Sequence, residues 1–465
     1  MKTSLLPTIA LAVLAVIPCF RSANAAPAKL SHAETLTTLA QKATSTDSSQ
    51  SAAAIEQLRA AGPDGLDAMF DVYSDRIRRQ QDIATPKDAA WDRLRAALDT
   101  VGQQRDCFAS HLYWFTDFEK AKAAARASGK PILSLRLLGK LNEEYSCANS
   151  RFFRTTLYPN TEVSRYLRDH FVLHWQSVRP VPRITIDMGD GRRIERTITG
   201  NSIHYILDAE GNPIDALPGL YGAKAFLAEL DRAVAAEHQA SELNGMQREQ
   251  FLVNYHSIRL AEIQKQWSID LARINQPAAP MTAALIWGST GAPDAIAAAA
   301  RAYSKTGVEA PLLRSGAESP LSRDINRVDA NISDSAWQKI AALHSDDAAP
   351  DAGSTRLIQF KQPPTAAEAT RVALTKAVVE TPAVRMLRNL QRSIAEDTVH
   401  NEYQLHSRIH EWFANGTAPT NLDALNSKIY ADLFLTPNSD SWLGLAPADT
   451  YSALDGGGLV QTQKP

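Results

Sequence analysis

A chain of 465 residues, 44% of them hydrophobic and 22% charged, is long enough to bury a sizeable core in two or three domains. Its formal net charge of −2 gives no reason to expect a nucleic-acid partner. Its three cysteines are far too few for a scaffold held together by disulfides. We therefore expect a globular protein whose core is apolar rather than cross-linked.

Residues 1–25 have the pattern of a secretory signal peptide. Lys2 supplies a positive charge, Leu5 to Phe20 is apolar, and Ala23-Asn24-Ala25 is a small-x-small cleavage site. The apolar run is short for a membrane span and contains two prolines, so cleavage is favoured over an uncleaved anchor. We expect a periplasmic or secreted protein with no membrane span after cleavage.

Residues 26–105 carry apolar side chains at helical spacing, which predicts an N-terminal helical region. The sequence Gly62-Pro63-Asp64-Gly65 would join two of its helices tightly. No second copy follows at a fixed period, so a helical cap on the next domain is favoured over an α-solenoid. The predicted helices are Ala33–Ala43, Ala52–Ala61, Gly65–Tyr73 and Ala89–Val101.

Residues 106–240 change to an alternation of strands and helices, which predicts an α/β domain with a mixed sheet. A helix over Phe118–Ala127 is stopped by Gly129-Lys130-Pro131, and an apolar strand follows up to Leu137. Gly189-Asp190-Gly191 is a hairpin signal. The later predicted elements are a helix over 160–170, strands over 171–178, 203–207 and 214–217, a hairpin over 183–197, and a helix over 222–237.

Residues 241–455 are mostly helical by pattern and form a predicted C-terminal helical domain, and residues 456–465 form a predicted disordered tail. Linker-like interruptions occur at 275–280, 345–353 and 362–364. An aromatic set is expected to form the core of this domain, namely Trp412, Phe413, Tyr430, Phe434 and Trp442.

Cys147 lies between the first predicted strand and a predicted helix start, in the sequence Cys147-Ala148-Asn149-Ser150. Unpaired N–H groups and the positive end of the helix dipole would favour a thiolate there. This is the arrangement of a thiol-disulfide protein, with serine in place of a second redox cysteine.

Residues from about 111 to 237 resemble the thioredoxin-like superfamily. The resemblance is carried by Trp114, the helix that ends at Gly129-Lys130-Pro131, the Cys147-x-x-Ser150 motif, Glu162-Val163, and Tyr205-Ile206-Leu207-Asp208-x-x-Gly211. It implies a thioredoxin-like α/β domain, a mixed sheet with helices on both faces, embedded between α-helical regions in a chain that is α-rich overall. It also implies that Cys147 would be the nucleophile and Ser150 its hydrogen-bond donor.

The chain departs from the family pattern at three places. Ser150 stands where the family has its resolving cysteine, so a dithiol cycle within this motif is excluded. Ser202 stands where the family usually has a cis-proline. The stretch from Lys130 to Cys147 is longer than usual, which predicts a bulging loop over Gly139–Ser146 and a cysteine displaced from the helix start.

Cys107 lies just before this domain and could fold back against Cys147. In an oxidising compartment a structural disulfide between them is the favoured outcome, followed by two unpaired thiols and then by a functional redox pair.

His400, Glu402, His406 and His410 lie in a region that should be helical, and residues 402, 406 and 410 share one helix face. A His-x-x-x-His pair with a carboxylate one turn away can bind zinc. The pattern lacks an HExxH motif, so packed or surface histidines are favoured, and no metal or other cofactor is expected.

Arginines gather at Arg151 and Arg154 and again in the hairpin at residues 179–196, where they could receive an anion. Acidic residues are interleaved at Asp187, Asp190 and Glu195, so a solvated, salt-bridged hairpin is favoured.

Two functional classes follow. The favoured one is a binding or assembly module for another exported protein, in which the thioredoxin-like site has degenerated. The alternative is a monothiol or Cys107-assisted thiol-disulfide oxidoreductase that acts on a thiol substrate through Cys147.

Overall fold

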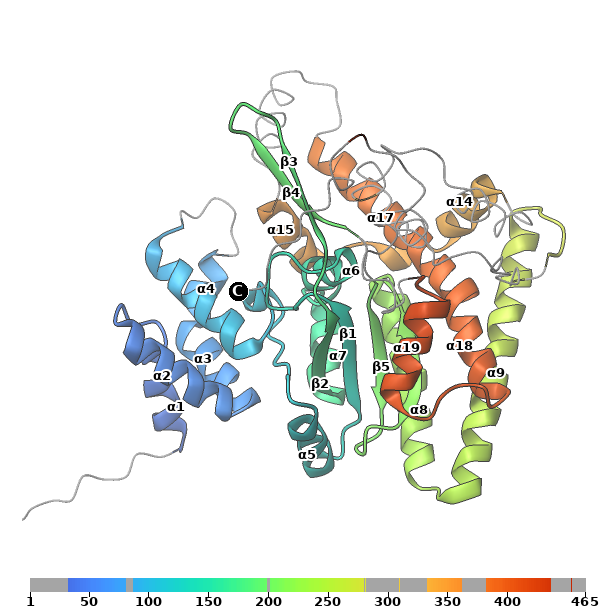
Figure 1. Cartoon of the computed structure of the whole chain (residues 1–465), viewed down its shortest axis with the longest axis horizontal. Helices are drawn as coiled ribbons and strands as arrows, with labels where there is room; N and C mark the ends of the chain where they lie inside the picture. The colour runs from blue at the N-terminus through green and yellow to red at the C-terminus, as the bar shows by residue number, and fades with distance from the viewer. Residues whose placement is uncertain are drawn as a thin grey trace, which may run out of the picture.

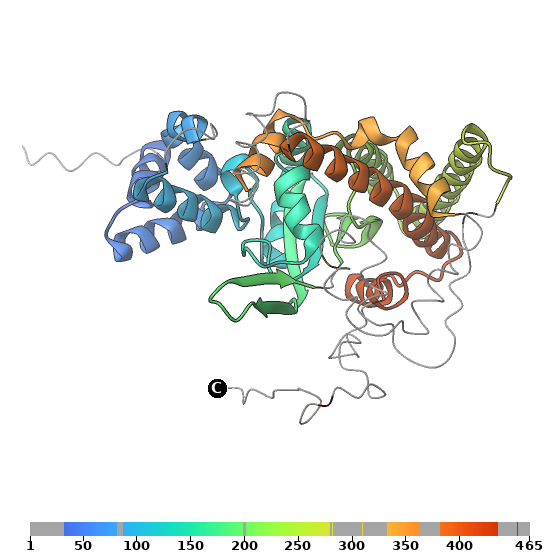
Figure 2. The same cartoon turned by 90° about the horizontal axis from the view of Figure 1, so that it is seen from above.

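The computed structural model describes residues 32–80, 87–198, 201–279, 281, 309, 333–361, 382–435 and 453. The predicted signal peptide, the linker at 362–364, Trp442 and the predicted tail lie outside these residues. In the described part, N-terminal helices, a sheet and C-terminal helices lie in a row (Figure 1), and the same order is seen from above (Figure 2). None of the described helices is long and apolar enough to cross a membrane.

Four helices form the N-terminal region, as predicted: α1 (His32–Lys42), α2 (Ser48–Ala60), α3 (Pro63–Gln80) and α4 (Ala89–Gly102). The Asp47 and Asp88 carboxylates accept backbone N–H groups at the starts of α2 and α4, which satisfies donors that a helix leaves unpaired. Gly65 lets α3 approach α2, because a Cβ there would lie 2.0 Å from the Leu58 carbonyl oxygen. These helices bury their own hydrophobic core, which includes Cys107.

The central sheet has the strand order β2-β1-β5-β6. Strand β1 is parallel to β2 and antiparallel to β5, and β5 is antiparallel to β6. In this register Ile132 is opposite both Val172 and Leu207. The strands are β1 (Ile132–Leu138), β2 (Val172–Arg179), β5 (Ile203–Leu207) and β6 (Pro213–Pro218).

Helices cover both faces of this sheet. Successive side chains of β5 point to opposite faces, so two neighbouring residues show what packs on each. On one face the His204 ring packs 5.1 Å from the Phe226 ring of α8 (Ala223–Ser241). On the other face the Tyr205 hydroxyl donates to Asn426 of α19 (Leu422–Asp432) at 3.2 Å. The prediction of an α-rich chain with a mixed sheet is confirmed at this level.

Two of the other helices around the sheet begin and end within one residue of their predicted bounds. Helix α5 ends at Gly129, whose φ of 68° is the left-handed conformation that favours glycine. Asn160 caps the start of α7 by accepting two backbone N–H groups. These elements are α5 (Phe118–Ser128), α6 (Ala148–Phe152), the π-helix η2 (Phe153–Leu157) and α7 (Thr161–His170), after the short 3₁₀-helix η1 (Cys107–Ala109).

The predicted hairpin forms a separate two-stranded sheet from β3 (Arg183–Asp187) and β4 (Arg193–Thr197). It projects away from the central sheet in both views (Figures 1 and 2). Its side chains are mostly exposed, which fits its content of charged residues.

Most of the C-terminal helices share one hydrophobic core with the sheet. The helices of this region are α9 (Gly245–Arg273), α14 (Asp334–Leu343), the 3₁₀-helix η3 (Ser345–Ala348), α15 (Ala352–Phe360), α17 (Pro382–His400), the π-helix η4 (Asn401–His406), α18 (Ser407–Ala414) and α19. Trp412, Tyr430 and Phe434 are buried in this core and Phe413 packs against it. Helix α15 instead reaches back to the N-terminal helices, where Leu357 is buried in their core.

Candidate functional site

Cys147 lies at the start of α6, where the loop from β1 returns the chain to the sheet. Its N–H group donates to the Leu138 carbonyl at 3.1 Å, and Gly139 turns the chain with a φ of 74°. The expectation that the longer loop displaces the cysteine is therefore wrong. The loop bulges, but a backbone hydrogen bond to the end of β1 brings Cys147 back to the helix start.

The Cys147 thiol is fully buried and has two hydroxyl groups as polar neighbours. Its Sγ lies 3.3 Å from Ser150 Oγ and 3.0 Å from Ser202 Oγ. Ser150 also donates to the Cys147 carbonyl at 2.9 Å. The structure thus brings together Cys147, Ser150 and Ser202, and no described peptide bond is cis.

Helix α19 covers this site. The Tyr430 hydroxyl donates to the Asn201 carbonyl at 2.7 Å, next to Ser202, and also contacts the Arg136 carbonyl at 3.3 Å. Asn201 in turn donates to the Phe434 carbonyl at 3.2 Å. Burial, with Cys147 as a close neighbour, raises the pKa of Tyr430 well above its usual value. The thiol therefore lies beneath a hydrogen-bonded helix rather than in an open cleft.

Cys107 lies in the other core, and the structure forms no bridge between the two cysteines. Its Sγ points at the Leu112 carbonyl, 3.6 Å away, and a Cβ on Gly102 would lie 2.3 Å from it. Burial, followed by the nearby Asp99 carboxylate, raises the pKa of Cys107 well above its usual value. The expected disulfide is not formed, because each thiol is packed in the core of a different region.

The arginines do not gather into one anion site. Arg192 and Arg193 in the hairpin form ion pairs with Asp190 at 2.6 Å and Asp187 at 2.9 Å, as the interleaved acids suggested. Arg154 is buried and its guanidinium lies 3.2 Å from the Asp106 carboxylate. These arginines are therefore already paired with acids of this chain.

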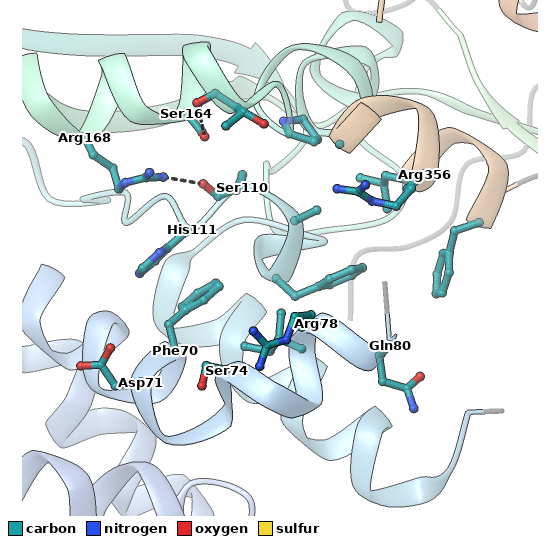
Figure 3. A pocket seen from close by; sticks show the side chains of 18 residues that line it. Phe70, Asp71, Ser74, Arg78, Gln80, Ser110, His111, Ser164, Arg168 and Arg356 are labelled. Atoms are coloured by element: carbon teal, nitrogen blue, oxygen red, sulfur yellow. Dashed lines mark hydrogen bonds between the residues drawn. The ribbon is translucent and has the colours of Figure 1, made fainter. Parts of the chain in front are cut away.

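A groove of about 530 Å³ lies between the N-terminal helices, α7 and α15 (Figure 3). Its apolar lining includes Phe70, Phe108 and Phe360. Arg78 comes from α3, Arg168 from α7 and Arg356 from α15, so all three elements bring a guanidinium to it. Its volume is in the range of ligand-binding pockets. No sequence pattern predicted it, because its lining residues come from segments nearly 300 residues apart.

Two of the groove's arginines are available to a ligand. Arg168 donates one N–H group to the Ser110 carbonyl at 3.0 Å (Figure 3). The other N–H groups of its guanidinium can donate to a ligand. Arg356 is exposed and forms no ion pair with any residue in the described part of the chain. Arg78 is paired with Asp75, and Asp71 contributes one negative charge to the lining.

Of the residues 400, 402, 406 and 410, the last three lie side by side, as their spacing predicted, and His400 packs elsewhere. Residues 401–406 are a π-helix, but the His406 and His410 ring centroids are still only 4.1 Å apart. His406 Nδ1 contacts Glu402 at 3.0 Å, whereas His410 Nδ1 contacts His256 Nδ1 at 2.8 Å. The His400 ring packs 3.9 Å from the Trp337 ring, as expected of a packed histidine.

Glu402, His406 and His410 belong to a larger buried cluster that we call the histidine–carboxylate cluster. It contains two groups whose side-chain N and O atoms lie within 4.8 Å of one another, Asp215 with His256 and His410, and Glu229 with Glu402 and His406. His406 joins the two groups, because its Nε2 contacts Asp215 at 3.2 Å. Asp215, Glu229 and His256 were not singled out from the sequence, although an aspartate inside the apolar segment Ile214–Leu217 was an available signal.

Burial by itself favours the neutral form of each of these groups. Contacts with neighbouring charges keep Asp215 and His406 charged. Burial raises the pKa of Asp215, but the surrounding histidines outweigh this effect and hold its pKa well below the usual value. Burial lowers the pKa of His406, but Glu402 and Asp215 raise it to about 10. Burial lowers the pKa of His256 to about 4 and, with His406, that of His410 well below its usual value. The cluster thus holds one imidazolium, two neutral imidazoles and the ionised carboxylates of Asp215 and Glu402, whereas burial, followed by the Glu402 charge, raises the pKa of Glu229 to about 7.

No protein-family model, curated protein or solved structure matches this chain. The function therefore has to be argued from the site geometry.

Proposed function

We propose that this chain is an exported thioredoxin-like protein that works as a binding or assembly module and does not carry out dithiol chemistry. The thioredoxin-like assignment is supported by the sheet order β2-β1-β5-β6, by the parallel β1–β2 pair, and by the cysteine at the helix start after β1. The export assignment is supported by the signal-peptide pattern of residues 1–25.

The complete burial of the Cys147 thiol carries this proposal. Thiol-disulfide exchange requires a thiolate that reaches a disulfide sulfur in line, and then a second thiol to release the mixed disulfide. Here helix α19 covers the sulfur, and its nearest polar neighbours are serine hydroxyls. The site is built to hold a thiol in place rather than to present it.

One observation favours the alternative, a monothiol oxidoreductase. The Ser150 and Ser202 hydroxyls, at 3.3 and 3.0 Å, could donate hydrogen bonds to a Cys147 thiolate if α19 moved away. The Cys107-assisted form of this alternative is not favoured, because Cys107 lies in the other core.

Mass mapping of alkylated cysteines in native and denatured protein separates the two functions. A binding module is expected to leave Cys147 unmodified by iodoacetamide in the native state, at least a hundredfold slower than in denaturant, since only opening of the core exposes the thiol. Cys107 serves as the internal control for a buried thiol. Rapid native modification of Cys147 alone, with mixed disulfide formed on added glutathione disulfide, would favour the oxidoreductase.

The groove in Figure 3 is the surface that we propose for the partner. Its phenylalanines and the guanidiniums of Arg168 and Arg356 match an extended peptide segment that carries aromatic and carboxylate side chains. Such a segment would pair the carboxylates with arginines that the chain itself leaves available.

Fluorescence anisotropy with a labelled peptide of alternating Phe and Glu tests this surface. The Arg356→Glu variant is expected to weaken binding at least about tenfold, because it reverses a charge at the groove. Arg126→Glu is the matched control, since Arg126 is exposed on α5 and does not line the groove. Equal binding by both variants, or equal binding of the peptide with Gln in place of Glu, would contradict the proposed surface.

A further inference from the structure

We propose that Asp215, His256 and His410 form a binding site for one divalent transition-metal ion, with zinc as the ion that fits this donor set. The inference does not depend on the thioredoxin-like assignment or on the groove. It concerns the part of the histidine–carboxylate cluster that lies between the sheet and the C-terminal helices.

The three side chains come from three elements that pack together. Asp215 is on β6, His256 on α9 and His410 on α18, and each is at most 1% exposed. Their donor atoms lie within 4.8 Å of one another, and the two histidine Nδ1 atoms are 2.8 Å apart. A tetrahedral zinc site places its donor atoms about 3.3 Å apart, so a small opening of the His256–His410 contact admits the ion.

Two imidazole nitrogens and one carboxylate oxygen are a recurrent donor set for zinc and for neighbouring divalent transition metals. A water molecule would complete a tetrahedral shell. Neither cysteine contributes, because Cys147 lies with the serines next to β5 and Cys107 lies in the N-terminal core. The site therefore predicts nitrogen and oxygen ligands without sulfur.

The Asp215 carboxylate is held in place by further contacts, as metal-binding carboxylates usually are. One oxygen accepts from the Tyr255 hydroxyl at 2.6 Å, and the other contacts His406 Nε2 at 3.2 Å. His406 is in turn held by Glu402 at 3.0 Å. The carboxylate is thus oriented before any ion binds.

The histidine pair also points to an ion. His410 is 0% exposed, and its Nδ1 lies 2.8 Å from the Nδ1 of His256, so one proton at most lies between the two ring nitrogens. Only one of the two nitrogens can then donate, and the contact gives this buried pair a single hydrogen bond. Two Nδ1 atoms facing each other beside a carboxylate are better satisfied by a shared cation than by a single hydrogen bond.

The other group, Glu229 with Glu402 and His406, is not the ion site in this proposal. The Arg259 guanidinium lies 2.7 Å from Glu229 and 3.6 Å from Glu402, so a cation of the chain already occupies this position. Glu229 and Glu402 also line a pocket of about 530 Å³, whose lining includes none of Asp215, His256 and His410.

The proposed ion would join β6 to α9 and α18 and so hold the sheet and the C-terminal helices together. Because the three ligands are fully buried, the ion would enter as the chain folds. Refolding is therefore the step at which it should be supplied.

Refolding with zinc chloride, followed by desalting and elemental analysis, tests the proposal. The wild-type chain is expected to retain about one zinc ion, and His256→Gln with His410→Gln less than roughly one tenth of an ion. His204→Gln is the matched control, a buried histidine of the sheet core that hydrogen-bonds Tyr158 at 2.7 Å. Wild-type protein without zinc, or equal loss of zinc in His204→Gln, would overturn the site.

X-ray absorption at the zinc edge of the wild-type protein keeps the test decisive if the variants do not fold. Two imidazoles and otherwise oxygen in the first shell would support the site. Sulfur in that shell, or fewer than two imidazoles, would overturn it. Neither result affects the alkylation of Cys147, so the proposed function and the proposed zinc site are tested independently.

Discussion

Two buried polar clusters lie beside the β5–β6 hairpin, and they are satisfied in different ways. Around Cys147 the partners are the neutral hydroxyls of Ser150 and Ser202. Around Asp215 the partners are histidines and a tyrosine from three helical segments, and one histidine is charged. A neutral cluster costs little to bury, whereas a charged cluster is stable only while every charge keeps its partner.

Asp99 shows what happens to a buried carboxylate whose charged partner is more distant. One of its oxygens accepts the Cys107 N–H at 2.9 Å, whereas the other has no hydrogen bond in the described part of the chain and lies 3.8 Å from the Arg105 guanidinium. Burial, followed by the nearby Asp106 carboxylate, raises the pKa of Asp99 to about 7. Asp215, which is equally buried, has a pKa well below its usual value because cationic and polar partners surround it.

The largest effect is expected from Asp215→Asn in the presence of a chelator, which removes any contribution from a bound ion. The change leaves the buried His406 imidazolium with one carboxylate in place of two. We expect the free energy of unfolding in urea to fall by about 3–5 kcal/mol. Asp187→Asn, which removes an exposed hairpin ion pair with Arg193, should cost less than about 1 kcal/mol. Similar small losses in both variants would mean that the cluster is not held by its charges.

Asp99→Asn should raise the free energy of unfolding, whereas Asp215→Asn lowers it. The folded pKa of about 7 lies above the usual value of 3.8, so the stability that protonated Asp99 contributes is complete below pH 3.8 and is lost as the pH rises through 7. The variant should therefore match the wild type at pH 4 and exceed its stability at pH 8, by at most about 4 kcal/mol. Urea unfolding at both pH values measures this.

Asp92→Asn is the control for Asp99→Asn, because Asp92 is an exposed carboxylate on the same helix. It should change stability by less than about 0.5 kcal/mol at either pH. A stability gain in Asp99→Asn that is the same at pH 4 and pH 8 would contradict the assignment to this carboxyl group.

The smallest effects are expected at Cys147. Cys147→Ser keeps a group that can hydrogen-bond Ser202 and should change the free energy of unfolding by less than about 1 kcal/mol. Cys147→Val has no such group and leaves the Ser202 hydroxyl without this partner, so it should cost about 1–3 kcal/mol. Better tolerance of valine than of serine would show that the site is packed as an apolar core.

The local elements could be predicted from sequence because their signals are local. Gly129 stops α5, Asn160 caps α7, and alternating or continuous apolar residues mark the strands. The contact between Cys147 and Ser202 could also be predicted, since the resemblance places both residues at the same site. The π-helix at residues 401–406 could not be, although Glu402, His406 and His410 still lie side by side as their spacing of four residues predicted.

The sequence by itself determined most of the helices and strands, the mixed sheet in an α-rich chain, and the absence of a second cysteine from the motif Cys147-x-x-Ser150. Tertiary structure decided what surrounds each buried polar group. Helix α19 covers Cys147, Cys107 packs in the other core, and Asp215 meets histidines from residues 256 to 410. The physical reason is that pattern and capping act over a few residues, whereas the partners of a buried charge come from whichever distant segments pack beside it.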